Sequence, residues 1–130
     1  MKKVMLFGTF DILHKGHLNL FEQAKKFGDQ LIIVIARNKT VKKVKSKLPK
    51  YDEKERLAKV KEKIKHLNAK VILGQIRNKQ KIIEKHQPDI ICLGYDQISF
   101  TDKLRELKIP IKKLKPYKEH KYKSSKLKNT

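Results

Sequence analysis

The sequence has one cysteine, no tryptophan and only 13 acidic residues in its 130 residues. The lone thiol, that of Cys92, excludes an internal disulfide framework and any metal site built from several cysteines. No apolar run approaches the roughly 20 residues of a membrane-spanning helix, and the apolar part of the N-terminus is too short for a secretory signal. We therefore expect a cytoplasmic protein without membrane contact, in which residues 1–130 form a single domain.

Positive charge dominates the chain, with 34 Lys and Arg against 13 Asp and Glu and a formal net charge of +21. Such an excess suits a nucleic-acid partner, but only Arg37, Arg56, Arg77 and Arg105 are arginine, and aromatic residues make up only 7% of the chain. Nucleic-acid recognition favours the bidentate and stacking contacts of arginine and the base stacking of aromatic rings. We therefore expect a lysine-rich solvated surface or a site for a polyanionic small molecule, rather than a nucleic-acid interface.

Short apolar runs alternate with helical patterns along the chain. Strands are expected at Val4–Phe7, Leu31–Ala36, Val71–Leu73, Ile90–Leu93 and Ile111–Leu114. Helices are expected around the apolar residues of Leu20–Phe27, Leu57–Leu67, Ile82–Ile83 and Leu104–Leu107, with Asp52 and Glu55 at the start of the second. This alternation predicts a Rossmann-like, doubly wound α/β fold with a five-stranded parallel sheet and helices on both faces.

Two further stretches are basic and show neither a strand pattern nor a helix pattern. Lys39–Lys50 holds six lysines and no acid, and Lys112–Lys128 holds eight lysines and one acid. They are expected to be solvated loops or loops that contact a polyanionic ligand.

The segment Gly8–His17 joins the first predicted strand to the first predicted helix. In parallel α/β sheets, ligands bind beyond the carboxyl ends of the strands, and the free N–H groups at a helix start favour an anion. His14 and His17 flank Gly16 there, so two imidazoles can hold phosphate oxygens and stabilise charge that develops on phosphorus. The alternatives are a surface pair or part of a metal site, although the nearest acid, Asp11, suits a substrate or Mg²⁺ better than zinc.

Gly8–His17 resembles the HxGH motif of the cytidylyltransferase-like nucleotidyltransferase superfamily, and the resemblance covers nearly the whole chain. Ile91–Gln97 is similar to the nucleotide-base loop of that superfamily, and its LGYDQ sequence is most similar to archaeal FAD synthases. Lys123–Leu127 resembles the final motif, a helix start that binds nucleotide phosphates. Thr40–Lys50, followed by Arg56, resembles the basic segment that grips phosphates in glycerol-3-phosphate cytidylyltransferases.

This resemblance implies an enzyme that joins a nucleoside monophosphate to a phosphorylated acceptor and releases pyrophosphate. The favoured reaction is the transfer of AMP from ATP to FMN, which gives FAD. The alternatives are a cytidylyltransferase that uses CTP and a phosphorylated alcohol such as glycerol 3-phosphate, and a non-catalytic module that binds nucleotides or nucleic acid. Mg²⁺ or another divalent cation would neutralise the departing pyrophosphate, and members of the superfamily are often homodimers.

The resemblance also implies roles for individual residues. His14 and His17 are expected to be catalytic, at the α- and β-phosphates. Nucleotide binding is expected from Gly8, Thr9, Phe10, Gly16, Gly94, Tyr95, Asp96, Ser124 and Ser125. Binding of the phosphates or the acceptor is expected from Asp11, Lys45, Lys47, Arg56 and Lys118, and no metal ligand is assigned.

Three positions depart from the pattern of the superfamily. Lys123 stands where a serine or threonine is usual, and Lys118 stands where cytidylyltransferases have an arginine. Lysine keeps the charge but loses the bidentate fork of arginine. Asn38 stands where archaeal FAD synthases tend to have an aspartate, which puts a metal or ribose role at that position in question.

Overall fold

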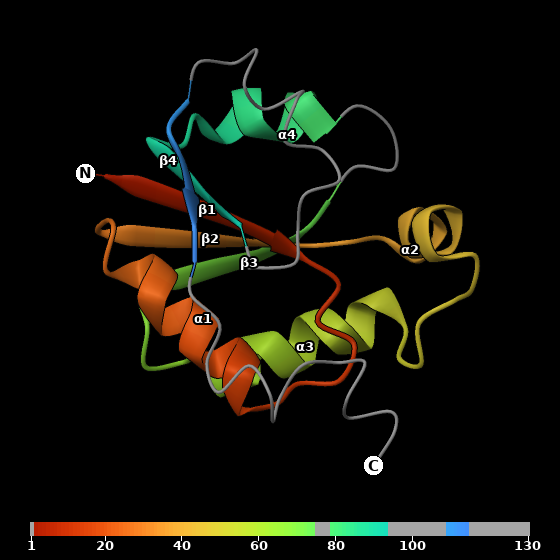
Figure 1. The fold of residues 1–130 in the computed structure, drawn as a ribbon. Coiled ribbons are helices and arrows are strands. Elements are labelled where there is room, and N and C mark those ends of the chain that lie inside the picture. Colours follow the sequence, from red (N-terminus) through yellow and green to blue (C-terminus); the bar gives the residue numbers. More distant parts are fainter. Residues whose placement is uncertain (1, 75–78, 94–108, 115–130) are drawn as a thin grey trace.

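The computed structural model describes residues 2–74, 79–93 and 109–114, and the backbone alone at residues 43–45, 79, 80 and 113. Nine elements lie in these ranges (Figure 1). They are β1 (Lys3–Gly8), α1 (Lys15–Lys25), β2 (Gln30–Ile35), α2 (Asn38–Lys45), α3 (Glu53–Lys63), β3 (Ala69–Leu73), α4 (Lys79–His86), β4 (Ile90–Leu93) and β5 (Ile111–Lys113).

The five strands form one parallel sheet in the order β3-β2-β1-β4-β5. Helices α1 and α3 pack on one face and α4 packs on the other, as Figure 1 shows. This arrangement confirms the predicted doubly wound α/β fold, with β1 at the centre.

Both faces of the sheet are buried, because each is covered by helices. Val4 and Leu6 of β1 pack in one core cluster with Phe21 of α1 and Val60 of α3. Met5 and Phe7 point to the opposite cluster, which contains Ile82 and Ile83 of α4. Burial on both faces explains why β1 and β2 are nearly continuous apolar runs rather than alternating ones.

The strands lie within two residues of their predicted bounds, whereas the helices differ more. The carboxylate of Asp52 caps α3 by accepting from the Lys54 N–H at 3.3 Å. Helix α3 ends at Lys63, so Ile64 and Leu67 follow it and yet still pack against the core. The predicted helix around Leu104–Leu107 lies outside the described residues.

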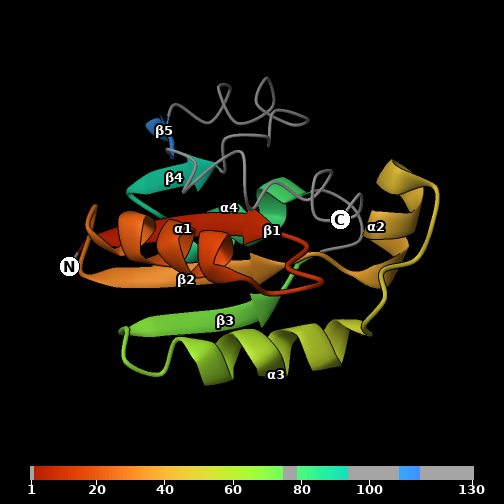
Figure 2. The ribbon, with the colours of Figure 1, turned by 60° about the horizontal axis from the view of Figure 1, so that its bottom comes forward.

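Helix α2 overlaps the basic stretch Lys39–Lys50, where the sequence predicted no element, and that expectation is wrong for residues 39–45. Val41 is buried, at 5% exposed, and anchors the helix to the rest of the molecule. Figure 2 shows that α2 lies on the side to which the carboxyl ends of β1 and β2 point. No helix in the described ranges is long and apolar enough to cross a membrane.

Candidate active site

The loop between β1 and α1 places His14 at the N-cap of α1. Its backbone is extended, with φ −143° and ψ 176°, and its Nδ1 accepts a hydrogen bond from the Gly16 N–H at 3.0 Å. Since Nδ1 accepts, the neutral ring carries its proton on Nε2, which can donate to an oxygen anion. Partial burial lowers the pKa of His14 below its usual 6.5 and so favours this neutral form.

His17 lies one turn into α1 and stacks on His14. The ring centroids are 4.0 Å apart and the ring planes are inclined by 26°. Phe10 also packs against His17 in a T-shaped arrangement, with the ring centroids 5.5 Å apart and an interplanar angle of 89°. The structure therefore brings together the two histidines that the sequence singled out and braces one of them with an aromatic ring.

Phe10 belongs to the core as well as to this loop. Its side chain is only 6% exposed, it packs on Phe21 with ring centroids 5.0 Å apart, and its backbone has a positive φ of 52°. The ring covers Gly8 so closely that a Cβ there would lie 2.4 Å from Phe10 Cζ. Gly8 is thus required by the packing of Phe10, and a positive φ in a bulky residue is a strained conformation that the surrounding packing sustains.

Asp11 connects the β1–α1 loop to the segment that follows α2. One carboxylate oxygen accepts from the Lys50 N–H at 2.7 Å, and the other accepts from the Tyr51 N–H at 2.8 Å. The exposed Lys47 lies on the segment that is held in this way. Lys45 is the last residue of α2, and its side chain lies outside the described atoms.

Arg56, in α3, is fully buried, with 0% of its surface exposed. Its guanidinium donates from Nε to the Tyr51 carbonyl at 3.0 Å and from NH1 to the Thr9 carbonyl at 2.9 Å. NH2 donates to Asn38 Oδ1 at 2.7 Å. Burial lowers the pKa of Arg56, whereas the nearby carboxylates of Asp11, Glu53 and Asp52 raise it. Arginine stays charged in proteins, so the guanidinium is a cation here.

A polar network at the start of α2 was missed by the sequence reasoning. Glu53 accepts from the Asn38 N–H at 2.9 Å and pairs with Arg37 at 2.8 Å. The Asn38 amide group donates to Asp52 at 2.7 Å while its carbonyl accepts from Arg56. An ionised aspartate accepts but cannot donate, so the amide of Asn38 makes a bond to Asp52 that the aspartate typical of archaeal FAD synthases could not make. The acidic first turn of α3 was the available signal for this network.

These hydrogen bonds lower the pKa values of both carboxyl groups. For Asp52 the largest cause is the hydrogen bond from the Asn38 side chain, and for Glu53 it is the one from the Asn38 backbone. Both groups are therefore ionised at neutral pH and can hold the cationic and N–H donors that face them.

The second half of the predicted site falls largely outside the structural description. Gly94, Tyr95, Asp96, Lys118, Ser124 and Ser125 are all in this part of the chain, so their roles stay predictions. Strand β4 does end at Leu93, beside β1 and parallel to it, with Leu6 opposite Cys92. The chain therefore enters the segment that begins at Gly94 from the same edge of the sheet as the histidines.

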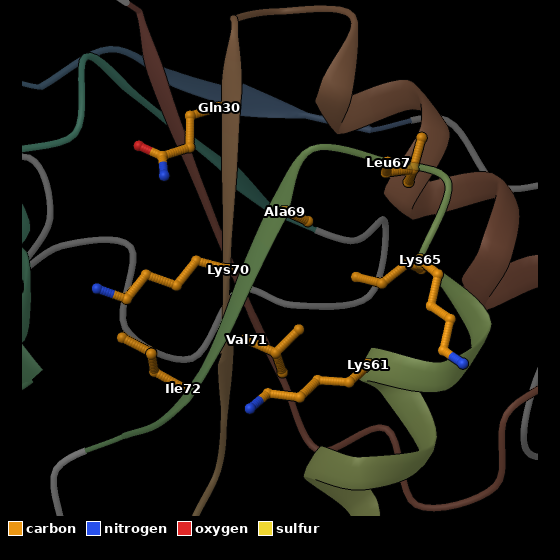
Figure 3. Close-up of a pocket in the computed structure, with 9 residues that line it drawn as sticks. Gln30, Lys61, Lys65, Leu67, Ala69, Lys70, Val71 and Ile72 are labelled. Carbon is orange, nitrogen blue, oxygen red and sulfur yellow. The ribbon is translucent and has the colours of Figure 1, made fainter.

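A groove of about 730 Å³ lies elsewhere, at the amino end of β2, along β3 and against the end of α3 and the residues that follow it (Figure 3). Lysines 61, 65 and 70 and several aliphatic side chains line it. None of the predicted site residues that the structure describes lines this groove. It lies along the edge strand β3, whereas His14 follows the central strand β1, so it is not the candidate active site.

The described residues do not fit a metal held by the protein alone. No group of three or more His, Cys, Asp or Glu side chains comes together in the described ranges. Asp11, the acid of the β1–α1 loop, already binds two backbone N–H groups. We therefore assign no step of the chemistry to a protein-bound metal.

Comparisons with known proteins give similar sequences and a similar fold. The sequence profile of the family described as cytidylyltransferase-like matches residues 5–128. The FAD synthase of Ferroglobus placidus is 46% identical over 107 residues, which cover 82% of this chain and 67% of that protein. The FAD synthase of Thermoplasma volcanium is 40% identical over 116 residues, which cover 86% of this chain and 80% of that protein.

A solved structure is also similar. The crystal structure of the lipopolysaccharide core biosynthesis protein from Thermoplasma volcanium GSS1 superposes with a TM-score of 0.79 at 38% sequence identity. The match covers 90% of this chain and 98% of that one.

Proposed function

Since the chain belongs to the cytidylyltransferase-like family, we propose that this nucleotidyltransferase transfers AMP from ATP to FMN and releases FAD and pyrophosphate. The observation that carries the proposal is the stacked pair His14 and His17 at the N-terminus of α1, at the carboxyl end of β1. Two relatives named FAD synthase, at 46% and 40% identity, support the choice of substrates.

The proposed reaction needs little covalent work from the protein. The FMN phosphate is already ionised at neutral pH, so it can attack the α-phosphorus of ATP in line without a general base, and the bond from that phosphorus to the β-phosphate bridging oxygen breaks. The enzyme then has to hold the two phosphates in line and to stabilise the charge that builds on the phosphoryl oxygens and the leaving pyrophosphate.

The histidines are suited to the second task. In its neutral form, His14 offers an Nε2–H donor beside the backbone N–H groups of the first turn of α1, and both favour an anion. We propose that His14 and His17 contact the α- and β-phosphates and that Lys47 meets the phosphate of the acceptor. Gly94, Tyr95, Asp96, Ser124 and Ser125 are proposed to bind the nucleotide, with Lys118 at its phosphates.

A substrate matrix tests the proposal. ATP or CTP is combined with FMN or glycerol 3-phosphate in the presence of Mg²⁺, and both pyrophosphate and the nucleotidyl product are measured. We expect turnover with ATP and FMN only. Turnover confined to CTP and glycerol 3-phosphate would replace the proposal with a cytidylyltransferase. Absence of pyrophosphate from every pair, together with salt-dependent binding to duplex DNA, would favour a nucleic-acid-binding module instead.

A further inference from the structure

We propose that Arg56 is a positioning residue that fastens the segment carrying Lys47 to the loop carrying His14, rather than a ligand of the phosphates. The inference rests on the proposed function, because the site that Arg56 would position is the proposed nucleotidyl-transfer site. It departs from the sequence-based prediction, in which Arg56 neutralises the charge of the triphosphate or the acceptor.

Burial is the first reason. Arg56 is the buried charged residue of the described core, at 0% exposed. Each of its three guanidinium nitrogens donates to an oxygen of the protein, at 2.7–3.0 Å. Because none of the surface of Arg56 is exposed, a phosphate could reach the guanidinium only if the residues that cover it moved and the present acceptors lost their donor.

The identity of the acceptors is the second reason, because they come from three separate segments. Thr9 belongs to the β1–α1 loop, Asn38 is the first residue of α2, and Tyr51 precedes α3. The planar fork of arginine holds three acceptors in fixed directions, which a single ammonium group cannot do. Arg56 therefore sets the relative placement of three segments at the carboxyl edge of the sheet.

Asp11 completes this arrangement from the other side. The Tyr51 N–H donates to Asp11, the Tyr51 carbonyl accepts from Arg56, and Arg56 in turn donates to Thr9, two residues before Asp11. These bonds form a closed ring that joins the β1–α1 loop to the 46–52 segment. Both the N–H and the carbonyl of Tyr51 are hydrogen-bonded in this ring. The position of the 46–52 segment along the chain direction is therefore fixed relative to the loop that carries His14.

The functional consequence concerns alignment. Lys47 lies four residues before Tyr51, and His14 lies three residues after Asp11, so each is close in sequence to one side of the ring. In-line attack depends on alignment, and displacements of about 1 Å can cost about 10²-fold in rate. Loss of the Arg56 fork should therefore misalign two substrates that are still able to bind.

The test uses the full chain with the variant Arg56→Lys, which keeps the charge and loses the fork. Asp11→Asn leaves one acceptor oxygen for the Lys50 and Tyr51 N–H groups and so weakens the same ring at another point. Lys63→Gln, at an exposed position of the same helix, is the matched control. The first readout is amide hydrogen exchange of Lys50 and Tyr51 without any substrate. We expect exchange at these amides to accelerate about tenfold or more in Arg56→Lys and Asp11→Asn, and not in Lys63→Gln, while amides of β1 and β2 change less.

Two exchange results would overturn the proposal. Unchanged exchange at Lys50 and Tyr51 in both ring variants would show that the ring does not hold the segment. Equal acceleration at the β1 and β2 amides would show that Arg56 supports the core in general. Should Arg56→Lys not fold, Asp11→Asn alone decides between these results.

The second readout is steady-state kinetics with ATP and FMN. A positioning role predicts that kcat falls about 10- to 100-fold in Arg56→Lys at saturating substrates, with KM for each substrate within about threefold of wild type. A large rise in KM with kcat unchanged would identify Arg56 as a ligand and would overturn the proposal. If the wild-type enzyme does not turn over ATP and FMN, the proposed function fails, and the exchange experiment still decides whether the ring exists.

Discussion

The rings of His14 and His17 stack with their centroids 4.0 Å apart. Two imidazolium ions at this separation would repel each other, so the stack favours a state in which at least one ring is neutral. The Gly16 N–H favours the same state at His14, because it donates to Nδ1. The site can therefore present an Nε2–H donor to an anion at neutral pH, and this chemistry leads to the first two predictions.

Replacing either histidine should slow the reaction far more than it weakens binding of the nucleotide. Contacts that strengthen as charge builds on the phosphates act on the transition state, and loss of one such donor costs about 10²–10³ in kcat. His14→Ala and His17→Ala are compared with wild type by kcat with ATP and FMN and by calorimetric binding of ATP. Equal losses in rate and affinity would instead mark the histidines as residues that bind the ground state.

The stability that depends on His14 should fall in mild acid. The folded pKa of His14 lies below the usual 6.5, so between the two values the unfolded chain binds the proton more readily. The contribution of neutral His14 to the free energy of unfolding is complete above about pH 6.5. It is lost as the pH falls through the pKa that His14 has in the folded protein. We expect the difference in free energy of unfolding between wild type and His14→Gln to shrink from pH 8 to pH 5, as measured by urea denaturation. A constant difference would contradict the lowered pKa.

Gly8→Ala should destabilise the protein and slow the enzyme together. The new Cβ would lie 2.4 Å from Phe10 Cζ, so the ring has to move, and that ring also braces His17. Overpacking of this kind costs about 1–3 kcal/mol, measurable as a lower urea midpoint. Gly74→Ala is the control, because its Cβ would meet Val34 Cγ1 at 3.1 Å, a contact that a small shift relieves. If Gly8→Ala had the kcat of wild type, the position of the Phe10 ring would not affect the histidine pair.

The thiol of Cys92 should resist reagents in the folded protein. Cys92 is fully buried in β4, and burial raises its pKa to about 11. At pH 8 about one thiol in a thousand is therefore ionised, and the thiolate is the reactive form. We expect slow labelling by an aromatic disulfide reagent in buffer and fast labelling in urea. Complete labelling of the native protein within seconds would show that β4 opens readily.

Local pattern was sufficient for the strands and for the histidine pair. An apolar run buried on both faces of a sheet is visible in the sequence itself, as in Val4–Phe7 and Leu31–Ala36. His14 and His17 are three residues apart at a strand-to-helix junction, and a separation of three places two side chains on one side of a helix start.

Contacts between distant residues were beyond such reasoning. Arg56 and Thr9 are 47 residues apart in the sequence, and Asp11 and Lys50 are 39 apart. In the sequence, Arg56 follows a basic stretch and is therefore predicted to bind phosphate. The packing of α3 against the sheet shows instead that its guanidinium is buried. Helix α2 was missed because its only apolar residues are Val41 and Val44, among four lysines. Its start is held by the bond that the Asn38 N–H donates to Glu53 and by the bond that Arg56 donates to the Asn38 side chain.

Short-range patterns of apolar and polar residues are sufficient to predict the parallel α/β class, the place of the candidate site at the end of β1 and the pair of histidines within it. The packing of Phe10 against His17 and the bonds by which Asp11 and Arg56 join two loops became visible only in the folded chain. Those bonds depend on which backbone groups are brought within hydrogen-bonding distance when α3 packs against the sheet, and long-range packing leaves no trace in local spacing.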